Sequence, residues 1–171
     1  MKRAAGSHMP NAISLLVLDV DGVLTDGRLY FGARGEALKV FHVHDGHGIA
    51  QLRRVGVQVA VISGRRSPMV AARCRELGVR HVHQGVPDKL TAFARLCARL
   101  GLQPGACACV GDDLPDVPLM RAVALSFAVA DAHREVRRAA DVVTRRRGGR
   151  GAVREVCDHL LALRARQARA R

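Results

Sequence analysis

The stretch LVLDVDGVLTDG, residues 16–27, places two carboxylates at alternate positions directly after an apolar run. Ionised carboxylates that lie close together repel each other, and each resists transfer out of water. Asp19 and Asp21 are followed at once by Gly22, as expected where a buried strand ends. The pattern therefore predicts a compensating positive charge at the end of this strand.

Polar residues also follow other apolar runs of the chain. They are Ser63 and Gly64 after the second run, Lys89 at the start of the helical segment that follows the third, and Gly111, Asp112 and Asp113 after the fourth. In open α/β sheets the carboxyl ends of parallel strands form one edge, where ligands bind. We therefore expect these residues to converge on a single site.

The expected site combines metal ligands with phosphate donors. Asp19, Asp21 and Asp112 offer hard oxygen ligands of the kind that Mg²⁺ prefers, and the metal would offset their repulsion. A carboxylate beside a metal-bound phosphate indicates nucleophilic catalysis through an aspartyl-phosphate. Ser63 and Lys89 are the donors that the other phosphoryl oxygens need.

Short apolar runs alternate with segments of helical periodicity along the chain. The runs span residues 14–20, 57–62, 79–83, 106–110, 125–129 and 142–143, and the helical segments span 48–55, 67–77, 89–100, 117–122, 133–140 and 152–166. This alternation predicts an α/β fold, a doubly wound (Rossmann-like) parallel sheet with helices on both faces. Residues 28–31 and 37–43 break the alternation and predict an inserted β-hairpin.

Composition agrees with a single domain in a reducing compartment. The chain has 171 residues, 49% of them hydrophobic, which is enough for a real core. Its five cysteines are an odd number without zinc-site spacing, so we expect buried thiols and a cytoplasmic protein. The letters GSHM at residues 6–9 indicate an expression scar over residues 1–8, which leaves residues 9–171 as the domain.

The net charge of +13 raises the question of nucleic-acid binding. The excess is mostly arginine spread along the chain, and one Tyr, four Phe and no Trp leave little for a base-stacking platform. No apolar run approaches the roughly 20 residues that cross a bilayer. We therefore expect neither a nucleic-acid nor a membrane partner.

Four short motifs identify a resemblance. The stretches DVDGVLTDG, VISGR, DKL and GDDLPDVP resemble, in order, the four motifs of the haloacid dehalogenase superfamily, and GGRGAVREVCD near the C-terminus is similar to the tail of one of its phosphatase subfamilies. The resemblance covers nearly all of the chain after the scar. It implies a magnesium-dependent phosphomonoesterase of the capless subclass, acting on a small sugar-acid phosphate.

The resemblance also assigns roles to single residues. Asp19 matches the nucleophile, and Asp21 matches the general acid/base whose backbone carbonyl also binds the metal. Ser63 matches the phosphate-binding hydroxyl, Lys89 the cation that steadies nucleophile and phosphoryl group, and Asp112 the third metal ligand. The remaining assignments are Asp113 and Asp116 as supporting acids, and Gly64, Arg65, Arg145 and Arg150 as substrate-binding residues beside Ser63 and Lys89.

Between Asp21 and Ser63 there is room only for the hairpin and one helix, so we expect no large cap domain. The hairpin carries Leu29, Phe31, Leu38 and Phe41, which a two-stranded ribbon can hardly bury alone. The resemblance implies a homotetramer in which hairpins meet. The cationic, glycine-rich tail at residues 144–152 suits closure over an anionic substrate.

Several alternatives stay open. The tail is also compatible with a solvated loop, and Asp113 and Asp116 with helix caps. His42, His44 and His47 look like a metal cluster, but no cysteine or carboxylate set completes a tetrahedral site. The substrate could be a related nine-carbon sugar-acid phosphate, and the motifs could persist in a non-catalytic binding or regulatory module.

Overall fold

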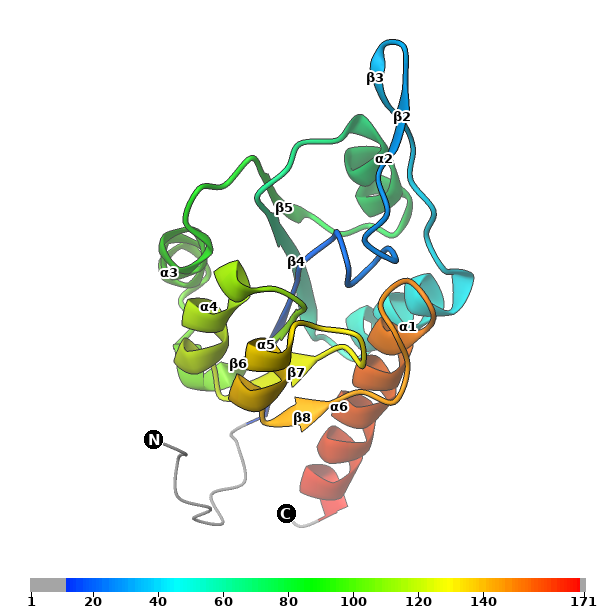
Figure 1. The fold of residues 1–171 in the computed structure, drawn as a ribbon. Coiled ribbons are helices and arrows are strands. Elements are labelled where there is room, and N and C mark those ends of the chain that lie inside the picture. Colours follow the sequence, from blue (N-terminus) through cyan, green and yellow to red (C-terminus); the bar gives the residue numbers. More distant parts are fainter. Residues whose placement is uncertain (1–11, 170–171) are drawn as a thin grey trace.

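A six-stranded parallel sheet, in the order β5-β4-β1-β6-β7-β8, forms the centre of the computed structural model, which describes residues 12–169 (Figure 1). The strands are β1 (Leu15–Leu18), β4 (Gln58–Ser63), β5 (His81–Gln84), β6 (Cys107–Gly111), β7 (Leu125–Ala128) and β8 (Val142–Val143). The six predicted runs are confirmed as strands. The predicted expression scar at residues 1–8 lies outside the described residues.

Strand β1 is central because its side chains are apolar on both faces. Every residue from Leu15 to Leu18 is at most 1% exposed. Leu18 pairs with Val61 of β4 and Val110 of β6. The carboxyl ends of three strands therefore lie side by side, with Asp19 emerging between them.

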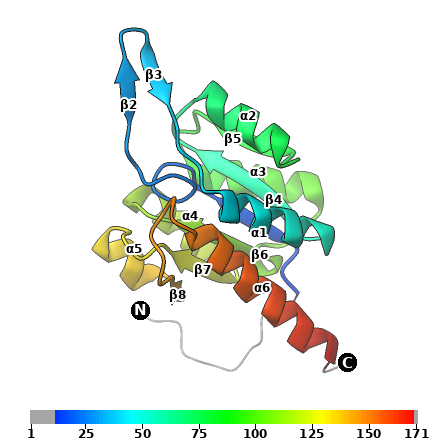
Figure 2. The same cartoon turned by 90° about the vertical axis from the view of Figure 1, so that its right-hand side faces the viewer.

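Helices cover both faces of the sheet, as Figures 1 and 2 show. One layer consists of α1 (Val43–Arg54), α2 (Pro68–Glu76) and α6 (Ala152–Arg169), and the other of α3 (Lys89–Leu100), α4 (Val117–Ala122) and α5 (Arg134–Ala139). Right-handed crossovers from β1 toward β5 place helices on one face, and crossovers in the opposite direction place them on the other. The doubly wound fold is confirmed.

The expected hairpin consists of β2 (Tyr30–Gly32) and β3 (Gly35–Leu38), which pair antiparallel and project from the body of the molecule (Figure 2). Its apolar side chains are exposed: Phe31 is 64% and Leu38 is 50% accessible to solvent. Within residues 12–169, the hairpin and α1 are the only helices or strands between β1 and β4.

The hairpin and helix α1 differ from the sequence prediction in their bounds. The second strand ends at Leu38 instead of residue 43, and α1 begins at Val43 instead of residue 48. His42 caps the helix, because its Nδ1 accepts a hydrogen bond from the backbone N–H of His44 at 3.2 Å. Gly48 lies inside the helix because α6 packs there: an added Cβ would lie 3.0 Å from Cys157 Cβ.

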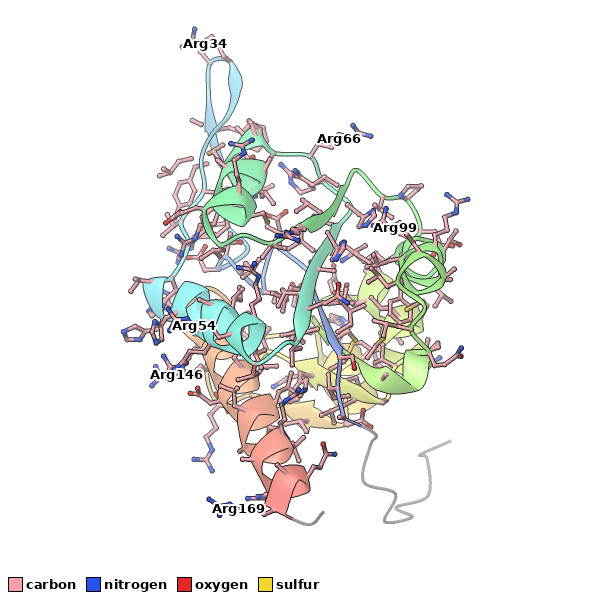
Figure 3. The ribbon with its side chains drawn as sticks, turned by 180° about the vertical axis from the view of Figure 1, so that it is seen from behind. Arg34, Arg54, Arg66, Arg99, Arg146 and Arg169 are labelled. Atoms are coloured by element: carbon pink, nitrogen blue, oxygen red, sulfur yellow. The ribbon has the colours of Figure 1, made fainter. Side chains whose placement is uncertain are left out.

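The distribution of the labelled arginines and the burial of the cysteines agree with the sequence analysis. Figure 3 shows labelled arginines on the hairpin, on three helices and in the loops, so the labelled charges form no single patch. All five cysteines are free and buried. Among the helices of residues 12–169, none combines the length and the apolar character that crossing a membrane requires.

Helices α1 and α6 are joined by a capping hydrogen bond. Gly151 precedes α6 and has no side chain with which to cap it. Asp45 of α1, only 1% exposed, takes this role, because its Oδ1 accepts a hydrogen bond from the backbone N–H of Arg154 at 2.7 Å. The first turn of α6 thus depends on a carboxylate from the other helix.

We expect Asp45→Ala to lower the free energy of unfolding by about 0.5–2 kcal/mol, since an N–H in the first turn of α6 loses the side chain that caps it. Urea denaturation measures this change. The matched control is Asp158→Ala, because Asp158 pairs with Arg154 on the exposed face of the same helix and should contribute only about 0.5 kcal/mol or less. Equal losses in the two variants would contradict the capping role.

Candidate active site

The loop after β1 presents the first two carboxylates. The N–H of Asp19 donates to Val110 O at 3.2 Å, which fixes the start of the loop beside β6. The N–H groups of Val23, Leu24 and Thr25 all donate to Val20 O, so the loop turns tightly just beyond Asp19. This turn carries Asp21 at the carboxyl edge of the sheet.

Lys89 reaches Asp19 from the N-terminus of α3. Asp88 caps this helix by accepting hydrogen bonds from the N–H groups of Leu90 and Thr91, and so fixes where Lys89 starts. Lys89 Nζ lies 2.9 Å from Asp19 Oδ1 and 2.6 Å from Asp116 Oδ1. The buried ammonium group of Lys89 therefore links the loop after β1 to the loop after β6.

Asp116 uses both carboxylate oxygens within the protein. Its Oδ1 accepts from Lys89, and its Oδ2 accepts from the N–H groups of Asp112 at 3.0 Å and Asp113 at 3.2 Å. These contacts hold the loop after β6 in place. Asp116 belongs to a short turn, Leu114–Asp116, that precedes α4, and the helix then begins at Val117, as the sequence predicts.

Three carboxylates, two buried and one half-buried, lie together at this edge. Oxygens of Asp19, Asp112 and Asp116 lie within 4.8 Å of one another. Burial, together with the Asp116 carboxylate, raises the pKa of Asp19 to about 6. Burial, followed by the charges of Asp19 and Asp116, raises the pKa of Asp112 to about 8. Lys89 alone therefore does not balance the negative charge.

The arrangement fits a hard divalent cation. Asp112 Oδ1 is buried and has no hydrogen-bond partner among the described residues. Gly22, with φ of +90°, leaves room for this carboxylate, since an added Cβ would lie 2.0 Å from Asp112 Oδ2. Carboxylate oxygens of Asp19 and Asp112 lie close together here and have the right chemistry for such a cation.

Ser63 and Gly64 lie at the end of the neighbouring strand β4. Ser63 ends β4, and its Oγ accepts a hydrogen bond from the N–H of Arg65 at 3.3 Å. The hydroxyl proton of Ser63 thus remains available to an anion. At Gly64 an added Cβ would meet nothing nearer than Val86 O at 3.7 Å, which leaves the backbone accessible.

A cleft of about 610 Å³ opens over these groups. Its lining includes Asp19, Asp21, Ser63, Gly64, Arg65, Lys89, Asp112, Asp113 and Asp116. Arg145 and Arg150 do not line this cleft. Arg145 lines a separate cavity of about 750 Å³ beside α6, and Arg150 Nη2 lies 3.7 Å from Asp26 Oδ2. The structure therefore brings nine of the eleven predicted site residues together.

The tail lies against the loop that carries Asp21. The N–H of Gly149 donates to Val23 O at 3.0 Å. At Gly148 an added Cβ would lie 1.6 Å from Gly22 O, so only glycine permits this approach. The tail glycines, which suggest a hinge in the sequence, here allow close backbone packing.

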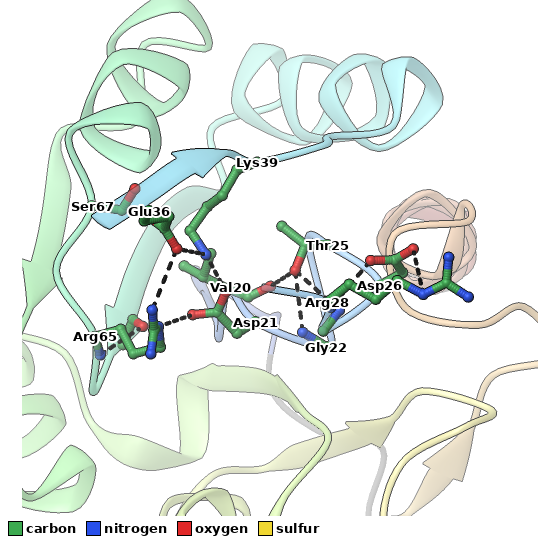
Figure 4. A network of polar contacts seen from close by, with 12 residues as sticks. Val20, Asp21, Gly22, Thr25, Asp26, Arg28, Glu36, Lys39, Arg65 and Ser67 are labelled. Atoms are coloured by element: carbon green, nitrogen blue, oxygen red, sulfur yellow. Dashed lines mark hydrogen bonds and ion pairs between the residues drawn. The ribbon is translucent and has the colours of Figure 1, made fainter. Parts of the chain in front are cut away.

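Sequence reasoning missed two residues behind the cleft, Lys39 and Glu36. Lys39 Nζ contacts Asp21 Oδ1 and lies 3.0 Å from Glu36 Oε1 (Figure 4). The signal that could have found Lys39 is its rarity, because the chain contains only three lysines beside 25 arginines. Sequence reasoning overlooked Lys39 because its neighbours are apolar and gave no sign that Lys39 itself is the buried residue.

Comparison with known proteins agrees with these motifs. The pattern of the haloacid dehalogenase-like hydrolases matches residues 36–124. The chain is 54% identical over 149 residues to the 3-deoxy-D-manno-octulosonate 8-phosphate phosphatase KdsC of Escherichia coli K12, a match that covers 87% of this chain and 79% of that protein. KdsC of Yersinia pestis is 52% identical over 87% of this chain and 80% of its own length.

Solved structures show the same fold. The phosphatase of Moraxella catarrhalis, in complex with magnesium, phosphate and a KDO molecule, matches with a TM-score of 0.88 at 41% identity, covering 91% of this chain and 89% of that one. The cobalt-bound phosphatase of Haemophilus influenzae matches with a TM-score of 0.89 at 43% identity, covering 92% of each chain. On its motifs, fold and sequence identity, the chain belongs to the haloacid dehalogenase-like hydrolase family.

Proposed function

We propose that this protein is a magnesium-dependent phosphomonoesterase that hydrolyses 3-deoxy-D-manno-octulosonate 8-phosphate to the free sugar acid and inorganic phosphate. The observation that carries the proposal is the cleft in which Lys89 bridges Asp19 and Asp116 beside the unpartnered Asp112 Oδ1. The relatives named for this activity support the choice of substrate. The reaction supplies the sugar acid for lipopolysaccharide, in the cytoplasm.

The residues that would hold Mg²⁺ are Asp19 and Asp112 through their carboxylates and Asp21 through its backbone carbonyl. Mg²⁺ bound there offsets the repulsion of the carboxylates and neutralises charge on the phosphoryl group. Support comes from the buried, unpartnered oxygen of Asp112 and from the raised pKa of both carboxyl groups, of Asp19 by burial and Asp116, and of Asp112 by burial, Asp19 and Asp116.

The reaction proceeds in two displacements at phosphorus. A carboxylate oxygen of Asp19 attacks the phosphorus, the bond to the sugar oxygen breaks, and Asp21 gives that oxygen a proton. The resulting aspartyl-phosphate is then attacked by water, which transfers its proton to Asp21 while the bond between Asp19 and phosphorus breaks. Asp21 returns to its starting state, and inorganic phosphate leaves.

Donors around the cleft hold the phosphoryl oxygens during both steps. The Ser63 hydroxyl and the Gly64 backbone lie at the end of β4, next to the strand that carries Asp19. Lys89 contacts Asp19 and therefore stands where charge develops on the transferring group. Arg65 extends the cationic lining toward the sugar.

The assembly we propose is a homotetramer in which hairpins meet. The support is the exposed apolar surface of the hairpin, which includes Phe31 and Leu38. The tail then borders a neighbouring cleft as well as its own loop. We assign Arg145 and Arg150 to the sugar carboxylate, which adds a second anionic group to the substrate.

Phosphate release from a panel of sugar-acid phosphates, with and without Mg²⁺, tests the function. We expect the eight-carbon substrate to exceed its nine-carbon relative, and chelation to abolish turnover. Asp19→Asn removes the nucleophile and should lower kcat by at least about 10³-fold, or 4 kcal/mol in barrier. Asp158→Asn is the control, and circular dichroism verifies folding. Normal turnover by Asp19→Asn would contradict the covalent mechanism.

Asp21→Asn preserves the shape of the side chain and the backbone carbonyl but removes the proton carrier. We expect kcat for the sugar-acid phosphate to fall about 10²- to 10⁴-fold, the usual contribution of general acid and base catalysis. Stopped-flow measurement with p-nitrophenyl phosphate isolates the first displacement, which needs little protonation of its leaving group and should suffer less. Activity within a few-fold of the unaltered protein would disprove the role.

The assembly and tail are tested together. Light scattering should give a tetramer. Arg150→Ala and Arg145→Ala should each raise KM for the sugar-acid phosphate about 10-fold, as expected for a lost charged hydrogen bond, with KM for p-nitrophenyl phosphate unchanged. Arg166→Ala, on the exposed face of α6, serves as control. A monomer with full specificity, or unchanged KM in both variants, would show that the site is complete without the tail.

A further inference from the structure

Lys39 is buried where the chain would be expected to expose it. It follows β3, and its neighbours Leu38 and Val40 are each 50% exposed. The Lys39 side chain is only 1% exposed. Burial of an ammonium group is costly unless it is paired, so this inverted pattern requires partners for Lys39 inside the protein.

The partners of Lys39 are the carboxylates of Asp21 and Glu36. Lys39 Nζ contacts Asp21 Oδ1, while Arg65 Nε lies 3.6 Å from Asp21 Oδ2. Glu36 Oε1 lies 3.0 Å from Lys39 Nζ and 3.4 Å from Arg65 Nη2. Figure 4 shows Asp21 held by one cation from the hairpin and another from the loop after β4, with Glu36 between the two cations.

Lys39 differs from Arg65 in its access to substrate. Arg65 and Asp21 line the cleft, whereas Lys39 is not among its lining residues. Any effect of Lys39 on the reaction must therefore pass through Asp21. A charged contact to one carboxylate oxygen restricts the rotation of the side chain and so fixes the direction in which the other oxygen points.

We propose that Lys39 is a positioning residue that contacts Oδ1 of the Asp21 carboxyl group and so orients Oδ2, which carries the proton, toward the leaving group. Glu36 of β3 pairs with the Lys39 ammonium group and holds it in place beside Asp21. This inference rests on the proposed role of Asp21 as proton carrier. It assigns the base of the hairpin a part in the chemistry that is separate from any contact between subunits.

The test compares two substrates by kcat/KM, which reports only the steps up to release of the first product. A sugar alkoxide needs a proton to leave, whereas p-nitrophenolate does not. Lys39→Met keeps the length of the side chain and removes its charge. We expect kcat/KM for 3-deoxy-D-manno-octulosonate 8-phosphate to fall about 10- to 100-fold, the size of effect that a misplaced catalytic group produces. For p-nitrophenyl phosphate it should change less than about 3-fold.

Arg99→Met is the matched control, since it also replaces a cation with Met but at an exposed position of α3, away from the hairpin (Figure 3). It should leave both values unchanged. Equal losses of Lys39→Met with both substrates, or no loss with either, would overturn the proposal. If Lys39→Met does not fold, Glu36→Gln carries the test: the same division between substrates is expected at smaller amplitude, and an equal change in both overturns the proposal.

Failure of the inference about Lys39 can be distinguished from failure of the proposed function. If the unaltered protein ignores the eight-carbon substrate but hydrolyses its nine-carbon relative, the substrate assignment fails. The nine-carbon compound also has an alkoxide leaving group, so the comparison with p-nitrophenyl phosphate still decides the role of Lys39. If the protein hydrolyses neither sugar-acid phosphate, the proposed function and the inference that rests on it both fail.

Discussion

Repulsion among three carboxylates, two buried and one half-buried, is the constraint on which the rest of the site depends. Asp19, Asp112 and Asp116 lie within 4.8 Å of one another, with Lys89 as the ammonium group that bridges Asp19 and Asp116. Such a cluster is unfavourable unless further positive charge enters. The fold accepts this cost at the carboxyl edge of the sheet, where bound ligands can offset it.

The parallel register explains why groups that are distant in sequence meet there. Leu18 pairs with Val61 and Val110, so the residues that follow β1, β4 and β6 emerge at one level. Lys89 then needs only the first turn of α3 to reach Asp19. The site is thus a property of three aligned strand ends and one helix start, and it needs no cap domain for its construction.

Much of this arrangement could be predicted from the sequence. Apolar runs fixed the strands to within a few residues, because a strand buried on both faces leaves a continuous apolar pattern. The polar residues after those runs then located the cleft, since topology places strand ends together. The roles of these residues rest on the family resemblance and remain predictions.

Other features depend on tertiary contacts that leave no local pattern. The predicted start of α1 is too late, because Gly46 and Gly48 are residues that usually interrupt helices. In the structure Gly48 lies inside the helix, where α6 packs so closely that only a small residue fits. Asp45 gave no sign of capping a helix more than a hundred residues away. Lys39 was hidden by exposed neighbours, because alternation along a strand predicts which residues share a face but not which face is buried.

The loop of residues 20–27 is held from two sides. Lys39 contacts Asp21 from the hairpin, and the N–H of Gly149 donates to Val23 O from the tail. A loop restrained in this way has little conformational entropy left to lose when a substrate arrives. Binding energy gained from a substrate is therefore not consumed in ordering this loop, and this preorganisation comes from segments that lie far apart in the chain.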